Sequence, residues 1–351
     1  MLVPNPSPLR PLYLALAYAV LIIYASLHPF YGWRDLGVSP LAFLDAAWPR
    51  YWTVFDLVTN AIAYLPLGFL LMLALRRRRD RWLPTIGAIL LGSLISFCLE
   101  SVQTWLPTRV ASNLDLGSNA LGTCIGALLA CWRGERFFLR VAVLQHRLLA
   151  PNPQIELGVT LIGLWLLTQL SPETILFGAG DLRHLLEITP AVPYAAHSFF
   201  AIETGIIVCN TIAIGLVTRT LLAERYSIYL TLAVFFILAL AIRALAAAIL
   251  VDPGQAFVWF TPGAGLGLMI GGAMLFLMLL LPPSLRIALA GLALMAGTVL
   301  VNIAPPNPYS EAAMAAWQQG HFLNFNGLTR LTAGLWPFIA LPYLMALGRR
   351  L

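Results

Sequence analysis

Long apolar runs separated by short polar segments dominate the chain, and they predict a bundle of membrane-spanning helices. A helix needs roughly 20 consecutive apolar residues to cross a bilayer core. Strand-like alternation of apolar and polar positions is absent. The predicted spans cover about residues 12–28, 54–75, 83–106, 113–132, 155–171, 196–221, 226–250, 259–281, 284–303 and 330–348. The pattern therefore predicts an all-α, polytopic transmembrane helix bundle of about ten spans.

An arginine-bearing segment at residues 133–154 interrupts this series. We interpret it as a cytoplasmic connector that can lie along the inner membrane surface as an amphipathic helix. It separates a first membrane region, residues 1–132 with four spans, from a second region of about six spans at residues 155–351. The fifth span is marginal in length, and its loss would invert the orientation of every later span.

Composition and charge agree with a membrane protein and set its orientation. The chain is 60% hydrophobic and 10% charged, whereas a soluble domain carries about 25% charged residues. All 21 basic residues are arginines, and 15 of them fall on one side if the N-terminus is inside. This bias predicts cytoplasmic N- and C-termini in a bacterial plasma membrane. Because the arginines lie between spans, we interpret them as topology signals and expect no nucleic-acid partner.

Three polar pairs stand out within the apolar spans. They are Asp56 with Asn60, Glu100 with Gln103, and Asp115 with Asn119. Residues three or four apart share one face of a helix. Each pair lies within about six residues of a predicted outer helix end, at most ~9 Å deep at 1.5 Å per residue. Three acids and three amides from consecutive spans are therefore expected at one depth.

Ionised carboxylates in the bilayer are costly, so these acids must face one another, a water-filled pocket or a cation. Arg109, on the predicted hairpin tip, is the first choice of internal counter-charge, and Arg50 is the second. With Arg109 paired, two surplus negative charges remain if all three acids are ionised. Either one acid is protonated or a cation binds. The alternative is a hydrogen-bonded network that only locks the three helices together.

These residues belong to a longer series that resembles the VanZ-like family, which is named for a protein that confers resistance to the glycopeptide antibiotic teicoplanin. The resemblance covers about residues 12–130 and implies a multi-spanning membrane protein. The matching positions are Tyr24, Ser26, Leu27, Pro29, Phe30, Asp56, Asn60, Tyr64, Pro66, Leu67, Gly68, Ser96, Glu100, Gln103, Arg109, Ser112, Asp115, Asn119, Gly122 and Gly126.

Two further patterns predict packing. Gly122 and Gly126 form a small-xxx-small motif, which is typical of closely packed membrane helices. Glu203 and Arg243 are matched in predicted depth on spans six and seven. We interpret them as a buried ion pair that joins these helices; a substrate site is the alternative.

The sequence favours a non-catalytic cell-envelope protein with an outer-leaflet polar pocket. The predicted pocket residues are Asp56, Asn60, Glu100, Gln103, Arg109, Asp115 and Asn119. Its expected partners are membrane lipids and a lipid-linked or amphiphilic envelope compound, or a glycopeptide antibiotic. No cofactor is expected, although a divalent cation at the acids would fit. The alternatives are a membrane enzyme that uses paired carboxylates on a lipid-linked substrate, a transporter or flippase, and a structural envelope subunit.

Overall fold

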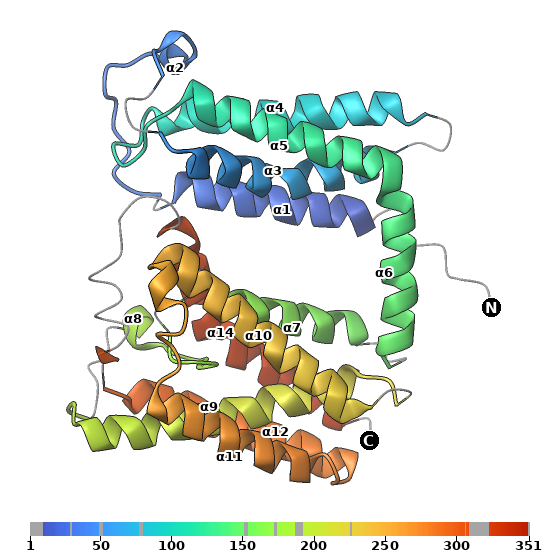
Figure 1. The fold of residues 1–351 in the computed structure, drawn as a ribbon, viewed down its shortest axis with the longest axis vertical. Coiled ribbons are helices and arrows are strands. Elements are labelled where there is room, and N and C mark those ends of the chain that lie inside the picture. Colours follow the sequence, from blue (N-terminus) through green and yellow to red (C-terminus); the bar gives the residue numbers. More distant parts are fainter. Residues whose placement is uncertain are drawn as a thin grey trace. The chain divides into compact units, whose positions relative to one another are not determined.

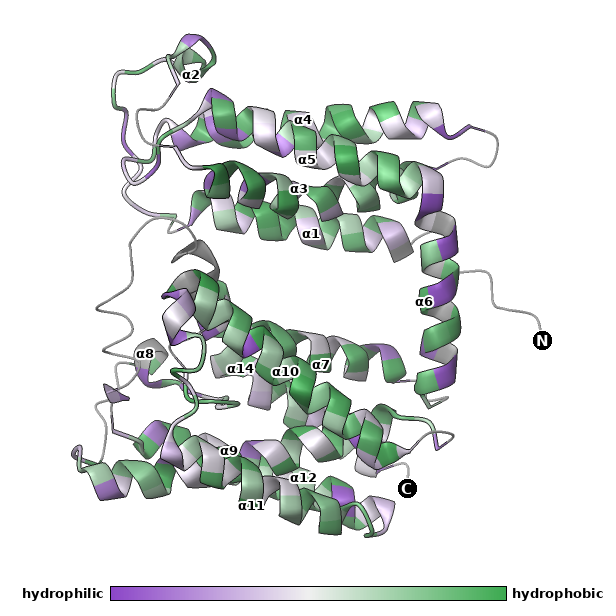
Figure 2. Ribbon diagram, viewed as in Figure 1, coloured by the Kyte–Doolittle hydropathy of each residue, from purple (hydrophilic) through white to green (hydrophobic). Residues whose placement is uncertain are grey.

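The structure is a computed structural model. It describes residues 10–28, 30–48, 52–76, 80–150, 154–171, 174–186, 192–224, 227–305, 307–308 and 323–349. The chain divides into two compact units, residues 1–145 and 146–351. Each is built from helices with apolar surfaces, as the hydropathy colouring in Figure 2 shows, and the described residues contain no strand. The all-α architecture expected from the hydrophobic pattern is confirmed.

In unit 1, four long helices lie side by side (Figure 1). They are α1 (Arg10–Leu27), α3 (Val54–Leu75), α4 (Trp82–Gln103) and α5 (Asn113–Leu129), with the short α2 (Ala42–Asp45) in the loop before α3. α5 packs most extensively against α3, and α4 contacts both of them. The end of the bundle that holds the α4–α5 loop is called the hairpin end below.

Local sequence signals explain where the helices at the hairpin end begin. The hydroxyl of Thr53 accepts a hydrogen bond from the backbone N–H of Asp56, and the Asp56 carboxylate accepts one from the N–H of Thr53. This reciprocal capping box fixes the start of α3. The Ser112 hydroxyl caps α5 by accepting from Leu114 N–H.

At the opposite end of unit 1 the chain turns through a π-helical turn, η1 (Ala130–Gly134), into α6 (Glu135–Leu148). Figure 1 shows that α6 runs crosswise to the four long helices. The ring of Phe137 on α6 meets that of Phe69 on α3 edge-on, with ring centroids 5.7 Å apart. The start of α6 is therefore fixed against the bundle.

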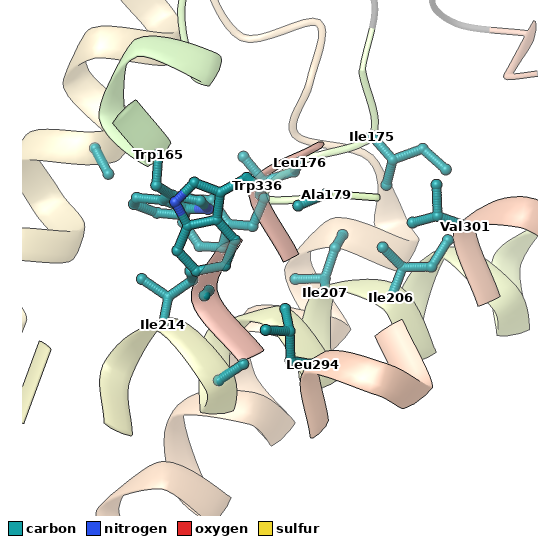
Figure 3. Packing of buried hydrophobic residues seen from close by; sticks show 14 of the residues in the cluster. Trp165, Ile175, Leu176, Ala179, Ile206, Ile207, Ile214, Leu294, Val301 and Trp336 are labelled. Carbon is teal, nitrogen blue, oxygen red and sulfur yellow. The ribbon is translucent and has the colours of Figure 1, made fainter. Parts of the chain in front are cut away.

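Unit 2 contains the remaining helices. They are α7 (Ile155–Thr168), α8 (Arg183–Leu186), α9 (Ala196–Leu221), α10 (Ile228–Leu250), η2 (Pro253–Gln255), α11 (Pro262–Met278), α12 (Pro283–Ile303) and α14 (Leu323–Gly348). α9 packs mainly against α11 and α12, and α14 packs against α7 and α12. The apolar core between them includes the fully buried side chains of Trp165 and Trp336 (Figure 3). The indole N–H of Trp336 donates to the carbonyl of Leu161, at 2.7 Å.

A buried segment without helical structure follows α7. The helix has 14 residues and covers only about 21 Å, less than a bilayer core. The chain then continues inside the unit, where Leu176, Phe177 and Ala179 are at most 3% exposed. Its backbone is satisfied by other helices, since Gly180 N–H donates to Ala333 O and Asn302 Nδ2 donates to Gly180 O, both at 2.7 Å. Irregular backbone is tolerated at membrane depth only when it is buried in this way.

A helix occurs at each of the ten predicted spans. Among the described residues, seven helices are long and apolar enough to cross a membrane, while α1, α7 and α11 are shorter apolar helices. The fifth predicted span is therefore partly helix and partly irregular chain. α14 begins at Leu323, earlier than the predicted residue 330. Arg50 and residues 309–322 of the predicted loop before α14 lie outside the described residues.

Candidate functional site

The amide of Asn60 joins α3 to α5 at the hairpin end. Its Nδ2 donates to Oδ1 of Asp115, at 2.7 Å. The carboxylate of Asp56 lies near enough to repel that of Asp115. Oδ2 of Asp56 also accepts from the Thr53 hydroxyl, at 2.8 Å, so this oxygen belongs to the N-terminal cap of α3. The structure thus brings two acids and one amide of the predicted pocket together.

Glu100 forms the buried part of the acidic cluster. It is 4% exposed, and its Oε2 accepts a hydrogen bond from the backbone N–H of Ser112, at 3.0 Å. Asp115 repels it and Arg109 attracts it through space. Because its side chain is buried and accepts a hydrogen bond from the loop backbone, Glu100 has little freedom to change its conformation. It therefore fixes the α4–α5 loop against α4.

Arg109, the predicted internal counter-charge, interacts with Glu100 through space and forms its hydrogen bond with another group. Its Nη2 donates to the backbone carbonyl of His28, at 3.1 Å. No ion pair of Arg109 with a carboxylate occurs among the described residues, although Glu100 attracts it electrostatically. Burial lowers the pKa of Arg109, and the charge of Glu100 opposes that shift. Arg109 therefore joins the α4–α5 loop to the end of α1.

A neutral hydrogen-bonded layer lies below the acids. Asn119 Nδ2 donates to the hydroxyl of Ser96, at 2.9 Å, which links α5 to α4. The Tyr64 hydroxyl bonds with Ser96 and Ser26, so α3 and α1 join the same layer. Gln103 Nε2 donates to the carbonyl of Ser26, at 3.1 Å. Asn119 is 6% exposed, and its Oδ1 has no hydrogen-bond partner.

The seven predicted pocket residues form several separate hydrogen-bonded groups, and electrostatic interactions act between these groups. The groups also include residues that the prediction omitted. The omitted members are Ser26, His28, Tyr64, Ser96 and Ser112. Helical spacing could have identified two of them, because Tyr64 follows Asn60 by four residues and Ser96 precedes Glu100 by four. The contacts of His28 and Ser112 use backbone atoms, so side-chain spacing does not predict them. Ser26, Tyr64, Ser96 and Ser112 do belong to the series that resembles the VanZ-like family.

Close packing of α3 and α5 holds these polar groups in register. A Cβ atom at Gly122 would lie 2.1 Å from the Ala61 carbonyl oxygen, and one at Gly126 would lie 2.0 Å from that of Leu65. In the opposite direction, a Cβ at Gly68 would lie 2.0 Å from the carbonyl oxygen of Thr123. The close helix packing predicted from the glycine spacing is confirmed.

Burial increases from the rim of this site to its floor. Asp56, Asn60, Gln103, Arg109 and Asp115 are half-buried, whereas Glu100, Ser112 and Asn119 are buried. The rim presents carboxylate oxygens and amides at the hairpin end. Within the described part of the chain, no three or more His, Cys, Asp and Glu side chains are grouped to hold a metal ion. The rim suits a hydrogen-bond donor or a cation that needs few protein ligands.

Glu203 and Arg243 have separate partners. Glu203 is 4% exposed and bonds with the side chain of Thr261, the residue that caps α11. A Cβ atom at Gly263 would lie 2.2 Å from Oε2 of Glu203, so the acid sits against the start of α11. A carboxylate is favoured there by the helix dipole.

Arg243, on α10, binds the irregular chain after α7. Its guanidinium donates to the carbonyls of Ser171 and Thr174 and, at 3.1 Å, to the Thr174 hydroxyl. The predicted Glu203–Arg243 ion pair is not among the described contacts. α9 packs on α11 and α12 more than on α10, which explains why the two side chains turn to different neighbours.

Comparison with known proteins agrees with the resemblance seen in the sequence. Residues 12–134 match the family model described as VanZ/LLP1. This range ends at η1 and covers the four long helices of unit 1. No curated protein and no solved structure gives a significant match to the chain. Residues 12–134 therefore form a VanZ-like domain in a multi-pass membrane protein.

Proposed function

We propose that the hairpin end of the VanZ-like domain binds the amine-bearing headgroup of an amphiphilic cell-envelope compound. The observation that carries this proposal is the carboxylate of Asp115, which lies close enough to that of Asp56 to be repelled by it and whose described donor, the Asn60 amide, is neutral. Asp115 accepts from the Asn60 amide, and Asp56 from Thr53. An ammonium group between the two acids would replace their repulsion with attraction.

The charge balance supports a cationic ligand. The cluster holds three acids, and Arg109 donates its described hydrogen bond to the His28 carbonyl. Asp115 repels Glu100, and Asp56 repels Asp115. A cationic ligand would offset this repulsion and stabilise the cluster. A divalent cation would serve the same purpose, but the described acids do not form a metal-binding group, which favours the amine.

The arginine distribution supports an outer-leaflet location. With the arginine-rich loops in the cytoplasm, the hairpin end faces outward in a bacterial plasma membrane. A ligand there has its headgroup at the rim and its acyl chain in the leaflet. Lipid-linked wall intermediates and lipoglycopeptide antibiotics such as teicoplanin have this amphiphilic form. The resemblance to the VanZ-like family supports them as candidate ligands.

A second candidate function, transport, has one specific observation in its favour. Transporters often build their sites from discontinuous helices near the bilayer centre, and α7 ends at Thr168 before a buried irregular segment. Solute uptake or lipid flipping by reconstituted protein, lost on Arg243→Gln and retained on Asp115→Asn, would favour this candidate. An enzymatic role has less support, because the described contacts of the cluster include no hydrogen bond between a nucleophile and a general base.

Native mass spectrometry of the full chain tests the proposal, with co-purifying lipids and added teicoplanin as probes. We expect the wild type to carry an amine-bearing adduct and Asp115→Asn to lose it while remaining folded. Asp45→Asn, at an exposed acid on α2, is the matched control and should keep the adduct. A chelator distinguishes a metal-bridged adduct from a direct one. Equal adducts in the wild type and Asp115→Asn would refute the proposal.

A further inference from the structure

Two parallel lines of side chains run along α6, and the lipid-binding proposal for the hairpin end does not involve them. Arg136 and Arg140 are exposed and four residues apart, Arg133 precedes them by three and Arg147 follows by seven. These spacings place the three arginines of α6, Arg136, Arg140 and Arg147, on one narrow stripe of the helix, and Arg133 lies in the π-helical turn η1 before it. Glu135 is the one acidic residue in the sequence of α6.

An exposed apolar line lies beside the arginines. Phe137, Val141 and Leu144 are spaced four and three residues apart, and they are 55%, 43% and 54% exposed. With 3.6 residues per turn, this apolar line lies about 90° around the helix from the arginines of α6, so the two lines occupy neighbouring faces. In Figure 2, α6 accordingly carries neighbouring hydrophilic and hydrophobic bands. A cationic line next to an exposed apolar line is typical of helices that lie in the membrane interface.

The geometry of unit 1 gives α6 the direction that such a helix needs. Three of the four long helices, α3, α4 and α5, are long and apolar enough to cross a membrane, and α6 runs crosswise to the four (Figure 1). It begins at the end of the bundle opposite the hairpin end, where Phe137 contacts Phe69 and Gly134 packs close to Leu73. The first turns of α6 are therefore held at the level where the bundle leaves the bilayer.

We propose that α6 binds anionic phospholipids of the leaflet at that end of the bundle. The arginine stripe meets the lipid phosphates, which guanidinium groups bind with two parallel hydrogen bonds. Phe137, Val141 and Leu144 enter the boundary between headgroups and acyl chains. Charge complementarity selects this occupant, because a line of arginines with one acidic neighbour favours an anionic surface over a neutral or cationic one.

Lipid competition on the full-length protein tests this surface. The purified chain is incubated with equal amounts of phosphatidylglycerol and phosphatidylcholine of the same acyl chains, and bound lipids are counted by native mass spectrometry. We expect the wild type to prefer phosphatidylglycerol. Arg136→Gln/Arg140→Gln should lower the ratio of the two lipids about fivefold or more, as expected for two arginines near an anionic surface.

Matched variants separate the surface from general charge effects. Arg34→Gln/Arg349→Gln removes the same charge from exposed positions elsewhere and should leave the ratio unchanged. Leu144→Ser should lower the binding of both lipids alike, because it removes apolar area without changing charge. Equal binding of the two lipids by the wild type would overturn the proposal, as would an equal loss in the Arg34/Arg349 control. Unchanged binding in Leu144→Ser would overturn the role of the apolar line.

Discussion

Asn60 on α3 and Asp115 on α5 are 55 residues apart in sequence, and the Asn60 amide donates to the Asp115 carboxylate at 2.7 Å. This contact joins the two helices that pack most extensively in the VanZ-like domain. It lies directly above the glycine contacts, where Gly122 faces Ala61. The Asn60–Asp115 hydrogen bond and the close approach of the backbones thus depend on the same register between α3 and α5. Both are needed to position the side chains at the rim of the proposed site.

Removing the amide of Asn60 should destabilise the domain. Asn60→Ala leaves Asp115 without its described donor, and we expect a loss of about 1–2 kcal/mol in the free energy of unfolding. The double variant with Asp115→Asn should lose less than the sum of the two single variants, because the two residues share one contact. Unfolding in mixed detergent measures all three.

Asn113→Ala is the control for that series. Asn113 is half-buried and donates to the carbonyl of the exposed Ala46 at 2.8 Å, so its loss should cost less and should add to that of Asp115→Asn. Full additivity of Asn60→Ala with Asp115→Asn would contradict the coupling.

Two glycines of α5 should respond oppositely to the same substitution. Gly122→Ala places a methyl group 2.1 Å from the Ala61 carbonyl oxygen, which forces α3 and α5 apart and should cost about 1–3 kcal/mol. Gly117→Ala meets nothing within 4 Å and should stabilise the helix by up to ~1 kcal/mol. Thermal unfolding of the two variants in the same detergent compares them, and equal effects would exclude close packing as the cause.

The helices and much of the site could be predicted because side-chain type and spacing encode them. Apolar runs mark each span, and four-residue spacing places Asp56 beside Asn60 and Asp115 beside Asn119 on a helix face. The partners of the charged groups could not be predicted in the same way. Arg109 binds the His28 carbonyl, and Arg243 binds the carbonyls of Ser171 and Thr174. Every residue has a carbonyl, so the sequence does not reveal which one a packed chain will present.

The position at which α7 ends could also not be predicted from the sequence. The predicted span runs to residue 171, three residues past Thr168, where α7 ends. Tertiary contacts decide otherwise, because Asn302 and Arg243 supply hydrogen bonds to an irregular backbone that could not exist in lipid alone. The hydrophobicity of a segment indicates that it is buried, but it does not determine whether its backbone is helical or irregular.

Glu203 and Arg243 should behave as independent sites. Glu203→Gln weakens the contact at the start of α11, and Arg243→Gln removes donors from the chain after α7. Each should lower the free energy of unfolding, by about 1–3 kcal/mol. Since their described contacts lie on different elements, the double variant should equal the sum within about 0.5 kcal/mol. A double variant more stable than Glu203→Gln alone would instead indicate the ion pair that the sequence suggests.

His28 should make the stability of the VanZ-like domain depend on pH. It follows α1 at the hairpin end, where burial and the charge of Arg109 lower its pKa from 6.5. The unfolded chain then binds more protons than the folded one between the two pKa values, so stability rises with pH through this window. The contribution of His28 is fully present above pH 6.5 and is lost as pH falls through the folded-state pKa.

Thermal unfolding between pH 7.5 and 5 should show this fall. His28→Gln should flatten the fall, Arg109→Gln should reduce it, and His197→Gln, on α9, should leave it unchanged. A profile in which His28→Gln matches the wild type would assign the pH dependence to other groups.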